Sequence, residues 1–198
     1  MKLQIIVGST RPGRVTERVA KWAAGEAKKL PNTEVEIVDL ADYPLPLFNE
    51  AVSPQYNPNR QPEEVVKRWL KKIGEADAYL LVTPEHNRST SAVLKNAIDY
   101  LDVQFARKPV ALLAHGSTGG AQAVAQLRGI LPGVLAVSVP RAAFVINASA
   151  IIDENGRLDE AVAAQPYGPL GALQAVLADL KWYGDALKAA REASVSNS

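Results

Sequence analysis

The stretch Gly8-Ser9-Thr10-Arg11-Pro12-Gly13-Arg14-Val15-Thr16 decides the fold class, because it joins an apolar run to a segment with helical spacing. The run Leu3–Val7 comes directly before it, and Val15–Leu30 places its apolar residues near one helical stripe. Backbone amides at the start of a helix point outward and carry partial positive charge, so they attract phosphate. The stretch therefore predicts a strand, a phosphate-binding loop and a helix, in that order.

This loop differs from the two common nucleotide-binding loops, since it has neither Gly-x-Gly-x-x-Gly nor Gly-Lys-Ser/Thr. Its candidate donors are two hydroxyls and two guanidinium groups, from Ser9, Thr16, Arg11 and Arg14. Such a set suits one terminal phosphate monoester better than a pyrophosphate. An ordinary strand-to-helix connection with caps remains an alternative interpretation of the loop taken alone.

Four more short apolar runs follow, and helical segments lie between them. The runs lack alternation, which is typical of parallel strands covered on both faces; they are Val35–Leu40, Ala78–Val82, Val110–Ala114 and Val134–Val139. The further helices are expected at Glu63–Gly74, Ala92–Val103, Ala121–Leu131 and Tyr167–Arg191. Strands that alternate with helices at this spacing predict an α/β fold with a doubly wound five-stranded parallel sheet.

A second polar loop, Thr83–Ser91, follows the third predicted strand. Pro84 stiffens the turn, and Glu85 and Asn87 can fix the loop so that its backbone faces a planar ring. His86 is weak evidence for acid–base catalysis, because a single histidine more often packs or makes a hydrogen bond.

A third loop, His115-Gly116-Ser117-Thr118-Gly119-Gly120, follows the fourth strand and is rich in glycine, which lets the chain approach a ligand closely. His115 is expected to cap the strand or pack locally. In the strand order 2-1-3-4-5, the loops after strands one, three and four converge on one crevice, where open α/β sheets bind ligands. The first loop would hold a phosphate and the other two would flank a flat polar ring.

The overall composition fits one globular domain, with 47% hydrophobic and 22% charged residues among 198. We expect a single domain over residues 1–192 and a frayed polar tail over 193–198. The net charge of +1 indicates neither a nucleic-acid nor a membrane partner. The chain has no cysteine, so disulfides, thiolate metal sites and a cysteine nucleophile are excluded, and redox chemistry would need a bound cofactor.

Further expectations concern the compartment, metals and the helix faces. The apolar N-terminal stretch is too short for a signal peptide or a membrane span, which predicts a cytoplasmic protein. No acidic cluster has metal-ligand spacing, which predicts no metal. The spacing places Trp22, Trp69 and Trp182 in the core, together with Tyr79 and Tyr100. The basic helix face at Lys67, Arg68, Lys71 and Lys72 is expected to be solvated.

On these motifs the chain resembles the NADPH-dependent FMN reductase family, whose members are flavodoxin-like and include quinone reductases, azoreductases and chromate-reducing proteins. The resemblance runs from Lys2 to about Arg141, and more loosely through the C-terminal helix. The most specific match is Thr83-Pro84-Glu85-His86-Asn87 with the following Leu94-Lys95-Asn96-Ala97-Ile98-Asp99, which is similar to the family's Pro-Glu-Tyr-Asn segment and its helix. The phosphate loop and Ser117-Thr118-Gly119-Gly120 also match.

The resemblance implies FMN as the bound cofactor and NADPH or NADH as co-substrate. It places Ser9, Arg11, Arg14, Val15 and Thr16 around the FMN phosphate, and Pro84, Glu85, His86 and Asn87 along the isoalloxazine and ribityl chain. Ser117, Gly119 and Gly120 would lie by the pyrimidine edge of the ring, where the two glycine amides could stabilise negative charge. No side chain need act as nucleophile or base, and one shared pocket predicts ping-pong reduction of a small-molecule electron acceptor such as a flavin, quinone or azo compound.

The sequence departs from the family pattern at two positions. His86 replaces the usual tyrosine, and Ser91 replaces the proline that many members have. Either could alter ring stacking or acceptor access. Many members are homodimers or homotetramers in which the neighbouring subunit covers the flavin, so the five-proline segment Pro44–Pro62 is expected to be an interface and lid.

Three other functions stay open at this point. A flavodoxin-type electron carrier would bind FMN without nicotinamide activity, although such carriers tend to be strongly acidic. A flavin-dependent regulatory sensor could use the basic helix face to contact a partner. A flavin-free hydrolase is the weakest alternative, because no Gly-x-Ser-x-Gly motif is present.

Overall fold

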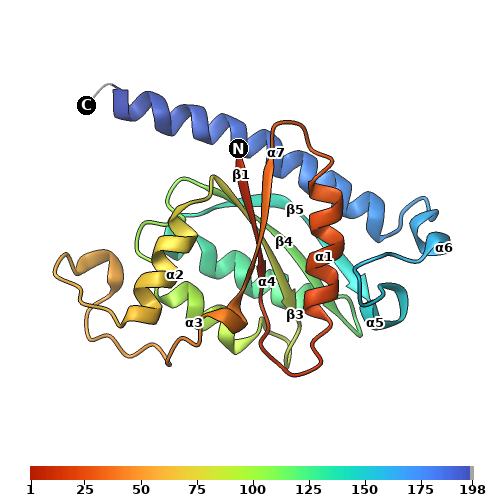
Figure 1. Ribbon diagram of the computed structural model, residues 1–198, viewed down its shortest axis with the longest axis horizontal. Coiled ribbons are helices and arrows are strands. Elements are labelled where there is room, and N and C mark those ends of the chain that lie inside the picture. Colours follow the sequence, from red (N-terminus) through yellow and green to blue (C-terminus); the bar gives the residue numbers. More distant parts are fainter. Residues whose placement is uncertain (197–198) are drawn as a thin grey trace.

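The computed structural model describes residues 1–196 and contains one five-stranded parallel sheet in the order β2-β1-β3-β4-β5. The strands are β1 (Lys2–Val7), β2 (Glu34–Asp39), β3 (Ala78–Pro84), β4 (Pro109–Gly116) and β5 (Val137–Ile146). Every paired neighbour is parallel. The predicted flavodoxin-like α/β sheet and its strand order are therefore confirmed (Figure 1).

Seven α-helices connect and cover the strands in this part of the chain. They are α1 (Thr16–Ala27), α2 (Glu64–Gly74), α3 (Ala92–Asp99), α4 (Ala121–Ile130), α5 (Ala148–Ile151), α6 (Glu160–Ala163) and α7 (Pro169–Ser196). Three short 3-10 turns, Leu40–Asp42, Pro54–Tyr56 and Leu131–Val134, lie between them. In Figure 1, α1 lies on one side of β1, whereas α2 and α3 lie on the other.

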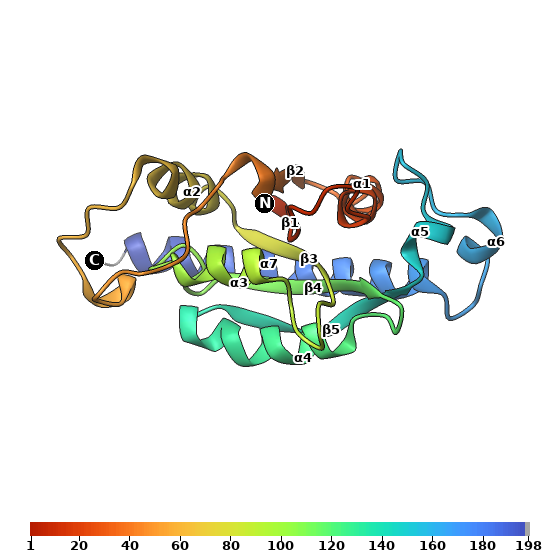
Figure 2. The same ribbon diagram turned by 90° about the horizontal axis from the view of Figure 1, so that it is seen from below.

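The sheet has a hydrophobic core on each face, which explains why the strand sequences are apolar without alternation. Ile5 packs with residues of α1 and α7 on one face, and its neighbour Ile6 packs with residues of α2, α3 and α4 on the other. Figure 2 shows these helices distributed around the twisted sheet. Trp69 and Tyr79 lie in the second core, as predicted, and Tyr100 joins them there.

Trp182 corrects the prediction for the tryptophans, since 67% of its surface is exposed while Trp22 and Trp69 are buried. It lies on α7, where Leu180 is buried against the sheet and Trp182 contacts the ring of Tyr183 edge-on at 4.9 Å. Helical spacing identifies the face of a residue, but it does not say whether another element covers that face.

The boundaries of two elements differ from the expectation. β5 begins at Val137 and continues to Ile146, whereas the apolar run had suggested Val134–Val139. Val134 belongs to a 3-10 turn, and the next residue, Leu135, has a φ of 59° that ends it. β5 is an edge strand in which exposed Pro140 and Arg141 interrupt the apolar residues, so the run before them ended the predicted strand too early.

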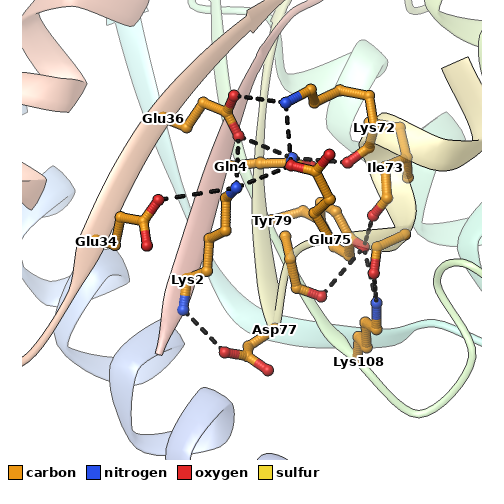
Figure 3. A network of polar contacts seen from close by, with 12 residues as sticks. Lys2, Gln4, Glu34, Glu36, Lys72, Ile73, Glu75, Asp77, Tyr79 and Lys108 are labelled. Carbon is orange, nitrogen blue, oxygen red and sulfur yellow. Dashed lines mark hydrogen bonds and ion pairs between the residues drawn. The ribbon is translucent and has the colours of Figure 1, made fainter. Parts of the chain in front are cut away.

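At the amino ends of the strands, a polar network joins β1, β2 and α2 (Figure 3). The Lys72 ammonium lies 2.9 Å from Glu36 and 3.0 Å from Glu75, and Lys2 contacts the same two carboxylates. These hydrogen bonds and charges raise the pKa of Lys72 and lower the pKa of Glu75. Lys72 is thus half-buried in ion pairs with two carboxylates. Lys67, Arg68 and Lys71 on the same helix are exposed, as expected for a solvated face.

The segment between residues 44 and 62 is held by one buried guanidinium group. Arg60 donates from Nε and Nη2 to the carboxylate of Glu50 at 2.7 Å and from Nη1 to the carbonyl of Tyr100 at 2.8 Å. Its side chain is only 7% exposed. The proline-rich segment therefore has a defined path across the surface, although it holds no α-helix or strand.

The C-terminal helix runs further than its apolar spacing suggested, to Ser196. Residues 193–196 of the expected tail belong to this helix, and residues 197 and 198 lie outside the described residues. No helix in the described part of the chain has both the length and the apolar character that crossing a bilayer demands.

Candidate functional site

A cavity of about 310 Å³ lies at the carboxyl ends of β1, β3, β4 and β5. It brings together eight of the twelve predicted site residues: Ser9, Arg11, Arg14, Val15, Thr16, Pro84, His86 and Ser117. The parallel sheet places these loops at one edge, which is why residues more than a hundred positions apart line the same space.

The loop after β1 presents its donors to this cavity. Helix α1 begins at Thr16 without a side-chain cap, whereas α3 begins with Ser91, whose hydroxyl accepts from the amide of Leu94 at 3.2 Å. Within residues 1–196, the N-cap residue Val15 therefore offers no side-chain acceptor to the first amides of α1. An uncapped helix start that opens into a cavity favours an anion.

Arg14 brings a guanidinium group to this end of the cavity, where acidic side chains hold it in place and offset its charge. One of its terminal nitrogens pairs closely with Asp39 and lies 3.8 Å from Glu17, and its side chain is 16% exposed. Its Nε is buried and has no hydrogen-bond partner within residues 1–196. A buried N–H is costly unless it finds an acceptor. The donor set and this unpaired N–H fit the phosphate of FMN.

The loop after β3 borders the cavity through Pro84 and His86. His86 and Ser89 exchange two backbone hydrogen bonds, of 2.9 Å and 3.0 Å, which close a tight turn. Asn87 and Arg88 occupy that turn with φ values of 49° and 66°. Burial and the nearby Arg11 lower the pKa of His86, so its imidazole is neutral at pH 7.

Glu85 and Asn87 do not line this cavity, so their predicted place beside the ligand stays a prediction. The carboxylate of Glu85 accepts from the amide of Gln122 at 3.0 Å, in the first turn of α4, and its own amide donates to the carbonyl of His115 at 3.0 Å. Glu85 therefore joins the second loop to the third. Asn87 is exposed in the turn.

Ser91 explains one departure from the family pattern. Its hydroxyl bonds closely to the carbonyl of Gly8 and also caps α3, so it connects the first loop to the second. Proline could make neither bond, because it has no side-chain hydroxyl.

The loop after β4 contributes Ser117, Gly116 and His115 to the cavity. Gly119 and Gly120, which were predicted to lie by the ring, do not line the cavity, and the amide of Gly119 donates to the carbonyl of Gly116 at 3.2 Å. His115 is buried, and its Nε2 lies 2.9 Å from the hydroxyl of Thr16. Burial, and repulsion from the His86 imidazolium that forms in acid, lower the pKa of His115 to about 4, so it is neutral at pH 7.

Gly120 permits the close approach of this loop to β4. It has a φ of 88°, and a Cβ there would lie 2.6 Å from the Cβ of Ala114. We expect Gly120→Ala to lower the free energy of unfolding by about 3 kcal/mol, from left-handed strain and overpacking together. Gly129→Ala in the same helix meets nothing within 4 Å and should stabilise by about 0.5–1 kcal/mol. Urea denaturation of both variants measures the difference. Equal stabilities would show that neither the left-handed φ nor the close contact with Ala114 requires glycine at position 120.

The sequence reasoning missed one side of the cavity, which Asn147, Ala148 and Ser149 form after β5. Asn147 has a φ of 48°, and its amide donates to the carbonyl of Gly116 at 3.2 Å. The carboxyl end of a fifth parallel strand has to reach the same sheet edge, so a correct end for β5 would have revealed these residues. Pro12 and Gly13 line the cavity as well.

Comparison with known proteins identifies the chain. Residues 1–150 match the model of the NADPH-dependent FMN reductase family. The chain belongs to this family. It is 38% identical over 144 residues to an NADPH azoreductase of Bacillus sp. (strain OY1-2), covering 71% of this chain and 74% of that protein. It is 33% identical over 166 residues to a quinone reductase of Pseudomonas putida, covering 79% and 83% respectively.

A solved flavoenzyme structure is similar to this chain over nearly its whole length. FerB of Paracoccus denitrificans, a flavoenzyme NAD(P)H:(acceptor) oxidoreductase, superposes with a TM-score of 0.71 at 25% identity, covering 93% of this chain and 97% of that one. Membership of the family makes the chain an oxidoreductase that uses FMN and NAD(P)H. Of the functions that the sequence left open, the enzyme is thus the one supported.

Proposed function

We propose that this FMN reductase transfers electrons from NAD(P)H to a quinone, an azo compound or a free flavin, with ping-pong kinetics and one cavity for both reactants. The single observation that carries the proposal is the convergence of the three loops on the cavity at the carboxyl edge of the sheet. The names of the relatives support the acceptor classes, since they include an azoreductase and a quinone reductase.

In this proposal the loop after β1 holds the cofactor by its phosphate. Ser9, Arg11, Arg14 and Thr16 supply the donors, and the uncapped start of α1 adds backbone amides beside Val15. Arg14 is held in place by Asp39, so its guanidinium group is oriented before the ligand arrives. Bound FMN supplies the ring that accepts and then donates the hydride.

The other two loops orient the ring and limit access to it. Pro84 and His86 would border it on one side and Ser117 on the other. Gly120 lies outside the cavity lining, and its amide is proposed as the donor that would stabilise charge on the ring. Glu85 and Gly119 would act indirectly, by fixing the shape of the loops. No proton transfer by a side chain is required, and the lowered pKa values of His86 and His115 agree with imidazoles that are neutral at pH 7.

We further propose a homodimer or homotetramer in the cytoplasm. The segment between residues 44 and 62 exposes large apolar side chains, with Leu47 82% and Tyr56 78% exposed. Exposed apolar side chains gathered on one segment are typical of an interface. Light scattering tests this: a mass of 21.2 kDa for the purified protein would contradict it.

Steady-state kinetics test the proposed reaction. Initial rates are measured over a range of NADPH concentrations, at several fixed concentrations of a benzoquinone, and then of an azo dye and of free FMN. Parallel lines in the double-reciprocal plots are expected, because each reactant would meet the enzyme in turn. Intersecting lines would contradict the shared cavity, and the absence of turnover with all three acceptors would contradict the acceptor classes.

A further inference from the structure

His115 connects all three loops of the site, although the chemistry proposed above gives it no role. Its backbone lies at the end of β4, and its carbonyl accepts from the amide of Glu85 in the loop after β3 at 3.0 Å. Its Nε2 lies 2.9 Å from the Thr16 hydroxyl at the start of α1, in a contact that is buried on both sides. Both side chains line the cavity.

The proton between these two groups can be arranged in two ways. A neutral imidazole has one N–H donor and one acceptor nitrogen, and a hydroxyl has one proton to donate. If Nε2 accepts, the Thr16 proton is used up and the hydroxyl offers an approaching phosphate only lone pairs. If Nε2–H donates, the Thr16 proton is free for a phosphate oxygen. Only the second arrangement is attractive to an anion.

We propose that His115 is a positioning residue for the phosphate of FMN: its Nε2–H donates to Thr16, whose hydroxyl then donates to the phosphate. The inference rests on the proposed placement of that phosphate at the start of α1. The neutral form that it requires follows from burial, since a buried imidazolium without an acidic partner is unfavourable. His115 is 8% exposed and Thr16 is 1% exposed, so water competes little for either group.

The test reads the tautomer directly in the unmodified protein. Long-range ¹⁵N–¹H NMR spectra of the FMN-bound protein, labelled at histidine, distinguish a protonated from an unprotonated ring nitrogen. We expect the proton of His115 on Nε2 when FMN is bound. A proton on Nδ1 in the FMN complex would overturn the inference while leaving the proposed function intact. Failure of the protein to bind FMN at all would overturn both.

Variants with two ligands provide a second, independent measurement. Riboflavin has the same ring as FMN but no phosphate, so it serves as the matched control ligand. We expect Thr16→Val to weaken FMN binding about tenfold and His115→Leu several-fold, with little change for riboflavin. His115→Gln, whose amide can still donate, should recover part of the affinity. Because the two residues act in series, the double variant should bind FMN no more weakly than Thr16→Val alone. Tighter FMN binding by His115→Leu would indicate that His115 accepts the Thr16 proton, and would overturn the inference.

Discussion

Replacing Arg14 by leucine is expected to weaken FMN binding by about a hundredfold or more. The guanidinium group is mostly buried at the end of the cavity, and its Nε has no acceptor within the described residues. Hydrogen bonds to charged groups contribute about 1.5–3 kcal/mol each, and each 1.4 kcal/mol is a factor of ten in affinity. Loss of two such bonds to a phosphate gives the expected factor. Flavin titrations with FMN and riboflavin measure it, and riboflavin should be affected much less.

Two further variants distinguish the loss of a phosphate contact from a general loss of charge or of folding stability. Arg18→Leu removes a nearby cation, in the first turn of α1, whose partner Glu154 is 84% exposed, so FMN affinity should change less than about threefold. The double variant Arg14→Leu/Asp39→Asn avoids leaving the Asp39 carboxylate half-buried without its partner. If this double variant binds FMN as tightly as the parent, Arg14 does not contact the phosphate.

Trp69→Ala is expected to lower the free energy of unfolding by about 4 kcal/mol. Trp69 is 1% exposed, its ring meets that of Tyr43 edge-on at 5.4 Å, and its Nε1 donates to the carbonyl of Ala97 at 2.9 Å. Large-to-small substitutions of buried aromatic residues typically cost about 3–5 kcal/mol, because the cavity left behind does not fully collapse.

The matched control for Trp69 is Trp182→Ala, which removes the same side chain from an exposed position. Its cost should stay below about 1 kcal/mol, since surface substitutions away from buried features have small effects. Urea denaturation measures both variants in one series. Equal losses would mean that Trp182 is covered in solution, for example by a second copy of the chain.

The strands of the sheet could be predicted from the sequence mainly because the central strands are buried on both faces. The strands β1, β3 and β4 are covered on both faces, so each appears as a continuous apolar run that ends in turn residues. The edge strand β2 is mostly half-buried or exposed, and Val35, Ile37 and Val38 indicated it although Glu36 interrupts them. β5 was predicted too early and too short because Pro140 and Arg141 interrupt its apolar residues. The short helices α5 and α6 have only four residues each, which is too few for a periodic signal.

The site was predictable in its position and less so in its detail. Strand order alone places the loops after β1, β3 and β4 at one edge, and eight predicted residues do line the cavity there. Spacing cannot show where a side chain points: Glu85 turns to the amide of Gln122, and the Gly119 amide turns to Gly116. The contact between Thr16 and His115 joins residues 99 positions apart, so only the folded chain reveals it.

The measurement that tests the central claim most directly is the visible spectrum of the protein after incubation with FMN and desalting, followed by titration with NADPH in the absence of oxygen. The account predicts flavin absorbance that stays with the protein, at one FMN per chain, and bleaches as NADPH is added. NADH is then titrated in the same way. Loss of the flavin on desalting, confirmed by a titration that detects no binding, or retained flavin that neither nucleotide bleaches, would contradict the account.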